Sequence, residues 1–76
     1  MEELTRYIFQ NITNYPDQVK IKTEQEGEKL NIEVEVHEED MPRVIGKGGK
    51  VIRSIRNLLK VAAQKENLWI NLKLGE

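Results

Sequence analysis

Three of the chain's five glycines fall within four residues, in the segment Gly46-Lys47-Gly48-Gly49. Glycine adopts backbone conformations with positive φ and has no Cβ, so this cluster predicts a sharp turn that another backbone can approach closely. Apolar residues at helical spacing lie on both sides of the turn. The segment therefore predicts two helices joined by a short glycine loop.

The two helices around this loop differ in length. Asp40 is expected to be the N-cap of a short helix that runs through Ile45 and is stopped by Gly46. A longer helix is expected after Gly49, with a cationic face opposite an apolar one. The expected apolar face comprises Val51, Ile52, Ile55, Leu58, Leu59 and Ala62, and the expected cationic face comprises Arg53, Arg56 and Lys60.

The remaining elements follow from apolar periodicity. Helical spacing predicts a first helix from Leu4 to Tyr15, while alternation predicts a hairpin around Glu26-Gly27-Glu28-Lys29 and a last strand from Leu68 to Leu74. The expected buried stripe of the first helix is Leu4, Tyr7, Ile8, Ile12 and Tyr15, with Phe9 beside it. The order α-β-β-α-α-β predicts an α+β fold, in which three helices cover one face of a small three-stranded mixed sheet.

The charge is divided along the chain. Residues 1–40 hold four Lys or Arg against eleven Asp or Glu, a net charge of −7, whereas residues 41–76 hold eight against two, a net charge of +6. Between Met41 and Lys65 there are seven bases and no acid. Such a stretch creates a local positive field and indicates an anionic partner. On charge alone, a solvated helix face explains it equally well.

Length and composition exclude several classes of protein. At 76 residues the chain is expected to form a single domain over 1–76. It has no cysteine and one histidine, so thiolate chemistry and a His-rich metal centre are excluded, and we expect no cofactor. No apolar run is long enough to cross a membrane, and the acidic N-terminus lacks a basic signal region. We expect a cytoplasmic protein without a small-molecule substrate.

Catalysis is not expected either. The phosphate-binding pattern G-x-x-x-x-G-K-[ST] is absent, the acids of the first half form no recognisable pair, and Ser54 lacks a basic partner. His37 falls on the outward set of its strand and is expected to be solvated. We therefore assign no catalytic residue.

The glycine loop is suited to phosphate. A G-x-x-G turn can hold a sugar-phosphate chain against its own amides, and the helix that starts after it adds N–H groups and a positive dipole. Lys47 and Lys50 supply mobile cations, and Ile45 and Ile52 flank the loop with apolar surface. Two other interpretations stay open at this point: the glycines serve only as a helix cap and turn, or the helices form a DNA-binding helix-turn-helix.

The segment Val44-Ile45-Gly46-Lys47-Gly48-Gly49-Lys50-Val51-Ile52-Arg53-Ser54-Ile55-Arg56 resembles the signature of the KH domain, and the element order is similar to its type II arrangement. Length and flanking residues further resemble the small bacterial single-KH proteins of the KhpA family. The resemblance implies a single-stranded RNA-binding protein and RNA chaperone linked to cell elongation, cell shape and envelope homeostasis. It also implies a homodimer, or a heterodimer with a KhpB-type KH protein.

The resemblance implies a site at the loop and in an adjacent groove. The candidate RNA-binding residues are Gly46, Lys47, Gly48, Gly49, Lys50, Arg43, Arg53, Ile45 and Ile52. Val44, Ile55 and a residue of the strand from Leu30 to Val36 are further candidates for the groove floor. Gly48 makes the loop more flexible than two bulky polar residues would, so ordering it on binding costs additional entropy.

An alternative function is a protein–protein interaction module in which KH domains dimerise, with weak or no RNA binding. Phe9, Trp69 and the exposed edge of the sheet favour this interpretation. If the pairing surface included the glycine loop, dimerisation and RNA binding would compete.

Overall fold

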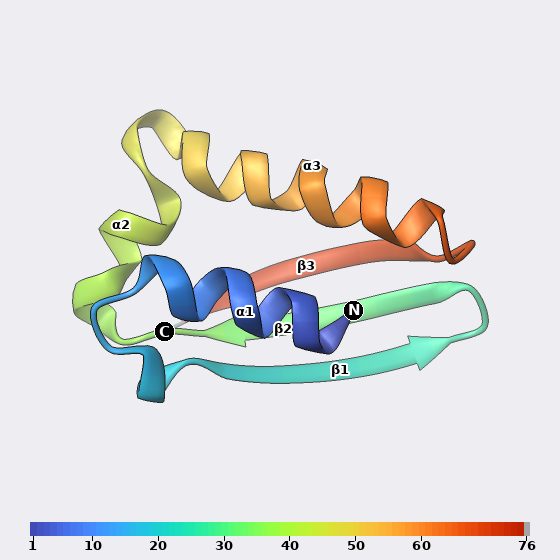
Figure 1. The fold of residues 1–76 in the computed structure, drawn as a ribbon, viewed down its shortest axis with the longest axis horizontal. Helices are drawn as coiled ribbons and strands as arrows, with labels where there is room; N and C mark the ends of the chain where they lie inside the picture. The colour runs from blue at the N-terminus through green and yellow to red at the C-terminus, as the bar shows by residue number, and fades with distance from the viewer. Residues whose placement is uncertain (76) are drawn as a thin grey trace.

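A computed structural model of the chain describes residues 1–75. Its sheet has the strand order β1-β2-β3, with an antiparallel pair β1 and β2 and a parallel pair β2 and β3 (Figure 1). The strands are β1 (Lys20–Glu26), β2 (Lys29–Glu35) and β3 (Trp69–Gly75). The predicted hairpin, mixed sheet and final strand are confirmed.

The helices lie on one face of this sheet (Figure 1). They are α1 (Glu2–Ile12), α2 (Met41–Ile45) and α3 (Lys50–Gln64). The described residues also form three short 3-10 turns: η1 (Pro16–Gln18), η2 (Glu38–Asp40) and η3 (Lys47–Gly49). The predicted α+β architecture and element order are confirmed. None of the helices among the described residues has the length and apolar character needed to span a bilayer.

The core forms between the central strand and the helices. Leu30, Ile32 and Val34 alternate along β2 and point under the helices, where they are buried. Phe9 of α1, Val44 of α2 and the buried face of α3 pack against them. Burying this apolar surface is the main stabilising contribution in so small a chain.

The predicted buried stripe of α1 is wrong in part, since only Ile8 and Ile12 of its five residues pack against the core. Phe9 is fully buried, whereas Leu4, Tyr7 and Tyr15 are exposed, Tyr7 by 67%. The buried face is rotated toward Thr5 and Phe9. Thr5 can be buried because its hydroxyl donates to the Met1 carbonyl oxygen at 2.8 Å, which satisfies it within its own helix.

The first helix also ends earlier than predicted, at Ile12, because a residue distant in the sequence binds the backbone that follows it. The buried Asp40 carboxylate accepts hydrogen bonds from the backbone N–H groups of Asn14 and Tyr15, at 2.9 and 3.0 Å. Asp40 does stand at the N-cap position of α2, as predicted, but its side chain makes no capping bond there. Its carboxylate joins the corner after α1 to the start of α2.

Tyr15 makes a second link at this corner. Its hydroxyl donates to Glu39 at 2.8 Å, and its ring stacks on His37 with 4.1 Å between centroids. The hydrogen bond to Glu39 raises the pKa of the Tyr15 phenol, because ionisation would place two negative charges side by side.

The apolar face of α3 differs from the prediction at one edge. Ile52, Ile55, Leu59 and Ala63 are buried, whereas Leu58 is exposed. Leu58 lies about 100° around the helix from Leu59, on the margin of the face that meets the sheet.

Candidate nucleic-acid interface

The glycine loop joins α2 to α3 at one end of the molecule (Figure 1). Gly46, Gly48 and Gly49 all have positive φ, at 76°, 64° and 77°. Gly46 ends α2, and its N–H donates to the Pro42 carbonyl oxygen at 2.9 Å. A Cβ at Gly46 would meet the Val51 side chain and lie 2.9 Å from its amide nitrogen. The close approach between α2 and α3 therefore requires glycine at this position.

The middle of the loop is open. Lys47 and Gly48 are exposed, and a Cβ at Gly48 would meet nothing within 4 Å. The Gly49 amide donates to the Gly46 carbonyl oxygen, and the Lys50 amide donates to that of Lys47. Among residues 1–75 the Lys47 and Gly48 amides have no protein acceptor. Two adjacent N–H donors with a positive helix end behind them are chemically suited to an anion.

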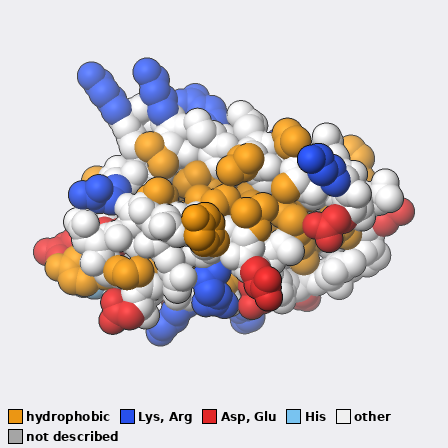
Figure 2. All heavy atoms as spheres, viewed as in Figure 1, with side chains coloured by type: hydrophobic (Ala, Val, Ile, Leu, Met, Phe, Trp, Pro, Cys, Tyr) orange, Lys and Arg blue, Asp and Glu red, His pale blue; other side chains and the backbone are white. Residues whose placement is uncertain are grey.

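The four candidate cations have different roles. Lys47, Lys50 and Arg43 are exposed, and their side chains have no hydrogen-bond or ion-pair partner among residues 1–75. Arg53 instead donates to the Gly48 carbonyl oxygen at 2.7 Å. This hydrogen bond holds the loop that contains Lys47 and precedes Lys50. Figure 2 shows Lys and Arg side chains projecting at this end of the molecule.

The apolar candidates are unequally exposed. Ile45 is 36% exposed beside the loop, whereas Ile52 is only 7% exposed. Val44 and Ile55, expected on a groove floor, are buried, as are Leu30, Ile32 and Val34 of β2 and Val36, which follows it. Among these residues, Ile45 offers the most apolar surface to a ligand.

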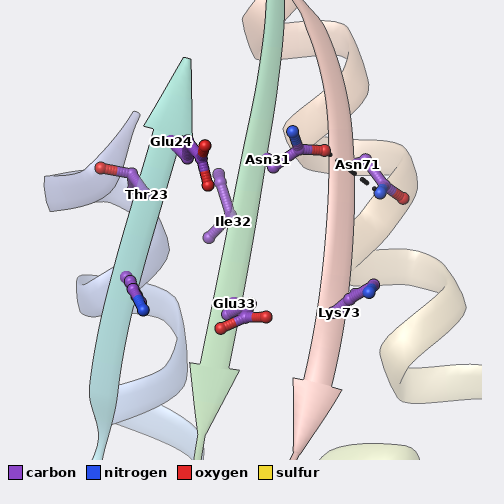
Figure 3. Close-up of a pocket in the computed structure, with 8 residues that line it drawn as sticks. Thr23, Glu24, Asn31, Ile32, Glu33, Asn71 and Lys73 are labelled. Atoms are coloured by element: carbon purple, nitrogen blue, oxygen red, sulfur yellow. Dashed lines mark hydrogen bonds between the residues drawn. The ribbon is translucent and has the colours of Figure 1, made fainter. Parts of the chain in front are cut away.

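A separate hollow lies on the bare face of the sheet, away from the helices (Figure 3). Its lining has mixed charge, because the strand register places Glu33 between Lys22 and Lys73. The Asn71 side-chain amide donates to Asn31 across the strands at 3.2 Å. The loop residues do not line this hollow, and its charge favours no particular anion.

Sequence reasoning missed the bracing role of Arg53. It placed Arg53 on the cationic face of the long helix, and the guanidinium does lie near the loop. The spacing between Gly48 and Arg53 could have predicted this contact. A residue five positions after Gly48 lies one turn inside the helix that follows the loop, close enough to bond back to it.

A sequence model of the family described as KhpA/KhpB, KH domain, matches residues 2–74 of the chain. The chain belongs to this family. The resemblance predicted from the glycine segment and the element order is thereby confirmed, and the observed mixed sheet with its helices is consistent with a KH fold.

Relatives in several bacteria match over nearly their whole length. The RNA-binding protein KhpA of Listeria monocytogenes is 36% identical over 76 residues, covering all of both chains. Proteins of the same name in Chlamydia pneumoniae and Halalkalibacterium halodurans are 34% and 32% identical, covering 100% and 97% of this chain and 97% of each relative. No solved structure matches the chain at a significant level.

Proposed function

We propose that this protein binds single-stranded RNA through the loop from Gly46 to Gly49. The observation that carries the proposal is the pair of Lys47 and Gly48 amides, which lie just before α3 and lack acceptors in the described part of the chain. The names of the full-length relatives, which describe RNA-binding proteins, support the same conclusion.

In this mechanism the loop holds the backbone of the RNA and reads few bases. The amides of Lys47 and Gly48 donate to phosphate oxygens, while the side chains of Lys47, Lys50 and Arg43 neutralise neighbouring phosphates. Arg53 keeps the Gly48 carbonyl turned away from the anion by donating a hydrogen bond to its oxygen. A base rests on Ile45, and Ile52 adds only its exposed margin.

Sequence preference should be weak, because no aromatic side chain adjoins the loop and Ile45 is apolar. Weak preference suits an RNA chaperone acting on many RNAs. The link to cell elongation and the cytoplasmic location stay predictions from the family resemblance.

The test compares two double variants that change charge equally. Lys47→Asp with Gly48→Asp should abolish binding of a single-stranded RNA, measured by fluorescence anisotropy, without altering the circular dichroism spectrum. Lys22→Asp with Gly27→Asp is the matched control, because Gly27 also has positive φ (59°) and open space around it. Undiminished affinity in the folded loop variant would contradict the proposal.

A second candidate function is pairing with another KH domain. Tyr7 of α1 and Leu58 and Val61 of α3 are exposed, and apolar side chains gather over the face that carries these helices (Figure 2). Phe9 does not contribute, since it is fully buried. Sedimentation over a dilution series tests this candidate: Leu58→Lys should shift a dimer toward monomer, and a strictly monomeric wild type at high micromolar concentration would exclude it.

A further inference from the structure

Trp69 is an exposed indole at the opposite end of the molecule from the glycine loop. It begins β3, next to the end of α3 (Figure 1), and is 71% exposed. Three shallow hollows adjoin it, one of which is lined by Glu28, Gln64, Asn67 and Leu68. The one on the α3 side is lined by Lys60, Gln64, Leu68 and Ile70, and the one on the hairpin side is lined by Glu26, Glu28, Lys29, Ile70 and Asn71. The indole is thus accessible from both sides.

A cationic ridge on α3 connects the loop with this indole. Arg53 donates to the Gly48 carbonyl oxygen, and Arg56 donates to the Leu72 carbonyl oxygen of β3 at 3.4 Å. Lys60 lines the hollow beside Trp69. Because these three positions are spaced by three and four residues, they lie on one side of α3, facing the outer edge of the sheet, and span about 10 Å.

The ridge carries one sign of charge. The sequence of α3 contains three Lys or Arg besides Lys50 among these fifteen residues, and no Asp or Glu. The contacts of Arg53 and Arg56 are to carbonyl oxygens, so neither cation is neutralised by an acid within residues 1–75. A polyanion that leaves the loop meets continuous positive charge along this side of the helix.

We infer that Trp69 is a second RNA contact, on which a base of the strand held at the loop stacks after its backbone has followed Arg56 and Lys60. The inference rests on the proposed RNA binding at the loop. Stacking on an exposed aromatic side chain accepts any base, and hydrogen bonds from the loop to phosphate are likewise independent of the RNA sequence. The chain would thereby hold a longer strand than the roughly four nucleotides a KH loop clamps.

The acids near Trp69 limit how far the strand continues. Glu26 and Glu28 outnumber Lys29 in the hollow on the hairpin side, so its net charge repels phosphate, whereas Lys60 lines the hollow on the α3 side. The strand therefore arrives from the α3 side and ends at the indole. The same acids would suit a cationic peptide lying on the indole, but such a peptide would be repelled by the ridge.

Because Trp69 is the only tryptophan, its fluorescence reports directly on this contact. An oligouridylate of about four nucleotides and one of about twelve nucleotides are titrated into the full chain. Both should bind, with loss of binding in the Lys47→Asp and Gly48→Asp double variant. Only the longer one should quench the emission of Trp69 and bind more tightly.

The variants separate this inference from the proposed function. Trp69→Ala should leave the short oligomer's affinity unchanged and weaken the longer one by about tenfold. Tyr7→Ala is the matched control, since Tyr7 is also a largely exposed aromatic residue, 67% exposed on α1. Lys60→Gln should weaken only the longer oligomer.

Three outcomes would overturn the inference. Loop-dependent binding of both oligomers with no quenching and no loss in Trp69→Ala would overturn it while leaving the proposed function intact. Failure of both oligomers to bind would overturn both proposals. Quenching by an oligoarginine peptide but not by the longer RNA would assign the indole to a cationic protein partner instead.

Discussion

Gly46 and Gly48 show how one residue type serves two purposes in the same loop. Both have positive φ, yet Gly46 is packed against Val51 while Gly48 faces open space. Gly46 therefore allows the two helices to approach each other, and Gly48 leaves the loop accessible. Replacing either residue strains the backbone, but only at Gly46 does a new methyl group collide with the neighbouring helix.

Alanine substitutions at these positions should separate the two effects. We expect Gly46→Ala to lower the free energy of unfolding by about 2–4 kcal/mol, from backbone strain and overpacking together. Gly48→Ala should cost only about 1–2 kcal/mol, from positive φ alone. Urea denaturation followed by circular dichroism measures both values. Equal losses of unfolding free energy in the two variants would show that the contact with Val51 does not add to the cost at Gly46.

At the scale of elements, Asp40 determines how α1 meets α2. Its buried carboxylate is bonded to the amides of Asn14 and Tyr15, which follow α1, while its backbone precedes α2. The helix that leads into the glycine loop is thus attached to the N-terminal helix by one side chain. Losing this attachment leaves two backbone donors without their acceptors.

We expect Asp40→Ala to destabilise the fold by about 2–4 kcal/mol, since each lost charge-assisted bond leaves an N–H unpaired. The stability of the Asp40→Asn variant should lie between those of Asp40→Ala and the wild type, because the amide oxygen can replace only one carboxylate oxygen. Thermal and urea unfolding provide the measurement. The exposed Asp17→Ala variant is the control and should change stability by no more than about 0.5 kcal/mol. A loss in Asp40→Ala as small as that of the control would refute this role.

At the scale of the whole molecule, the two halves of the chain place opposite charges in different regions. The basic half contains α2, the glycine loop and α3, whereas the acids of the first half belong to the start of α1, to η1, to the hairpin and to η2. The near-neutral total therefore conceals a positive surface where the candidate interface lies. Binding there should depend on salt more strongly than the net charge of −1 indicates.

A salt titration measures this dependence. For a short RNA held by two to four phosphate contacts, the slope of log K against log salt should be about −1.4 to −2.8. Lys47→Ala should make the slope less steep by about 0.7, because one phosphate contact is lost. Arg53→Ala should weaken binding at every salt concentration with little change of slope, because Arg53 braces the loop through Gly48. A salt-independent affinity would contradict an electrostatic interface at the loop.

Local pattern was sufficient to predict the elements, their order and the position of the glycine loop. Alternation marks strands and glycine marks the turns, because both depend on neighbouring residues alone. The sequence also selected Lys47, Gly48 and Lys50 as candidate binding residues, and all three are exposed in the structure.

Tertiary packing decided what these patterns left open. The rotation of α1 that buries Phe9 and exposes Tyr7 depends on how the helix meets the sheet, and several apolar faces of α1 were compatible with its periodicity. Asp40 reaches amides 25 and 26 residues away, and Arg56 reaches a strand 16 residues further along. Such bonds join residues that only folding brings together, so no spacing in the sequence could predict them.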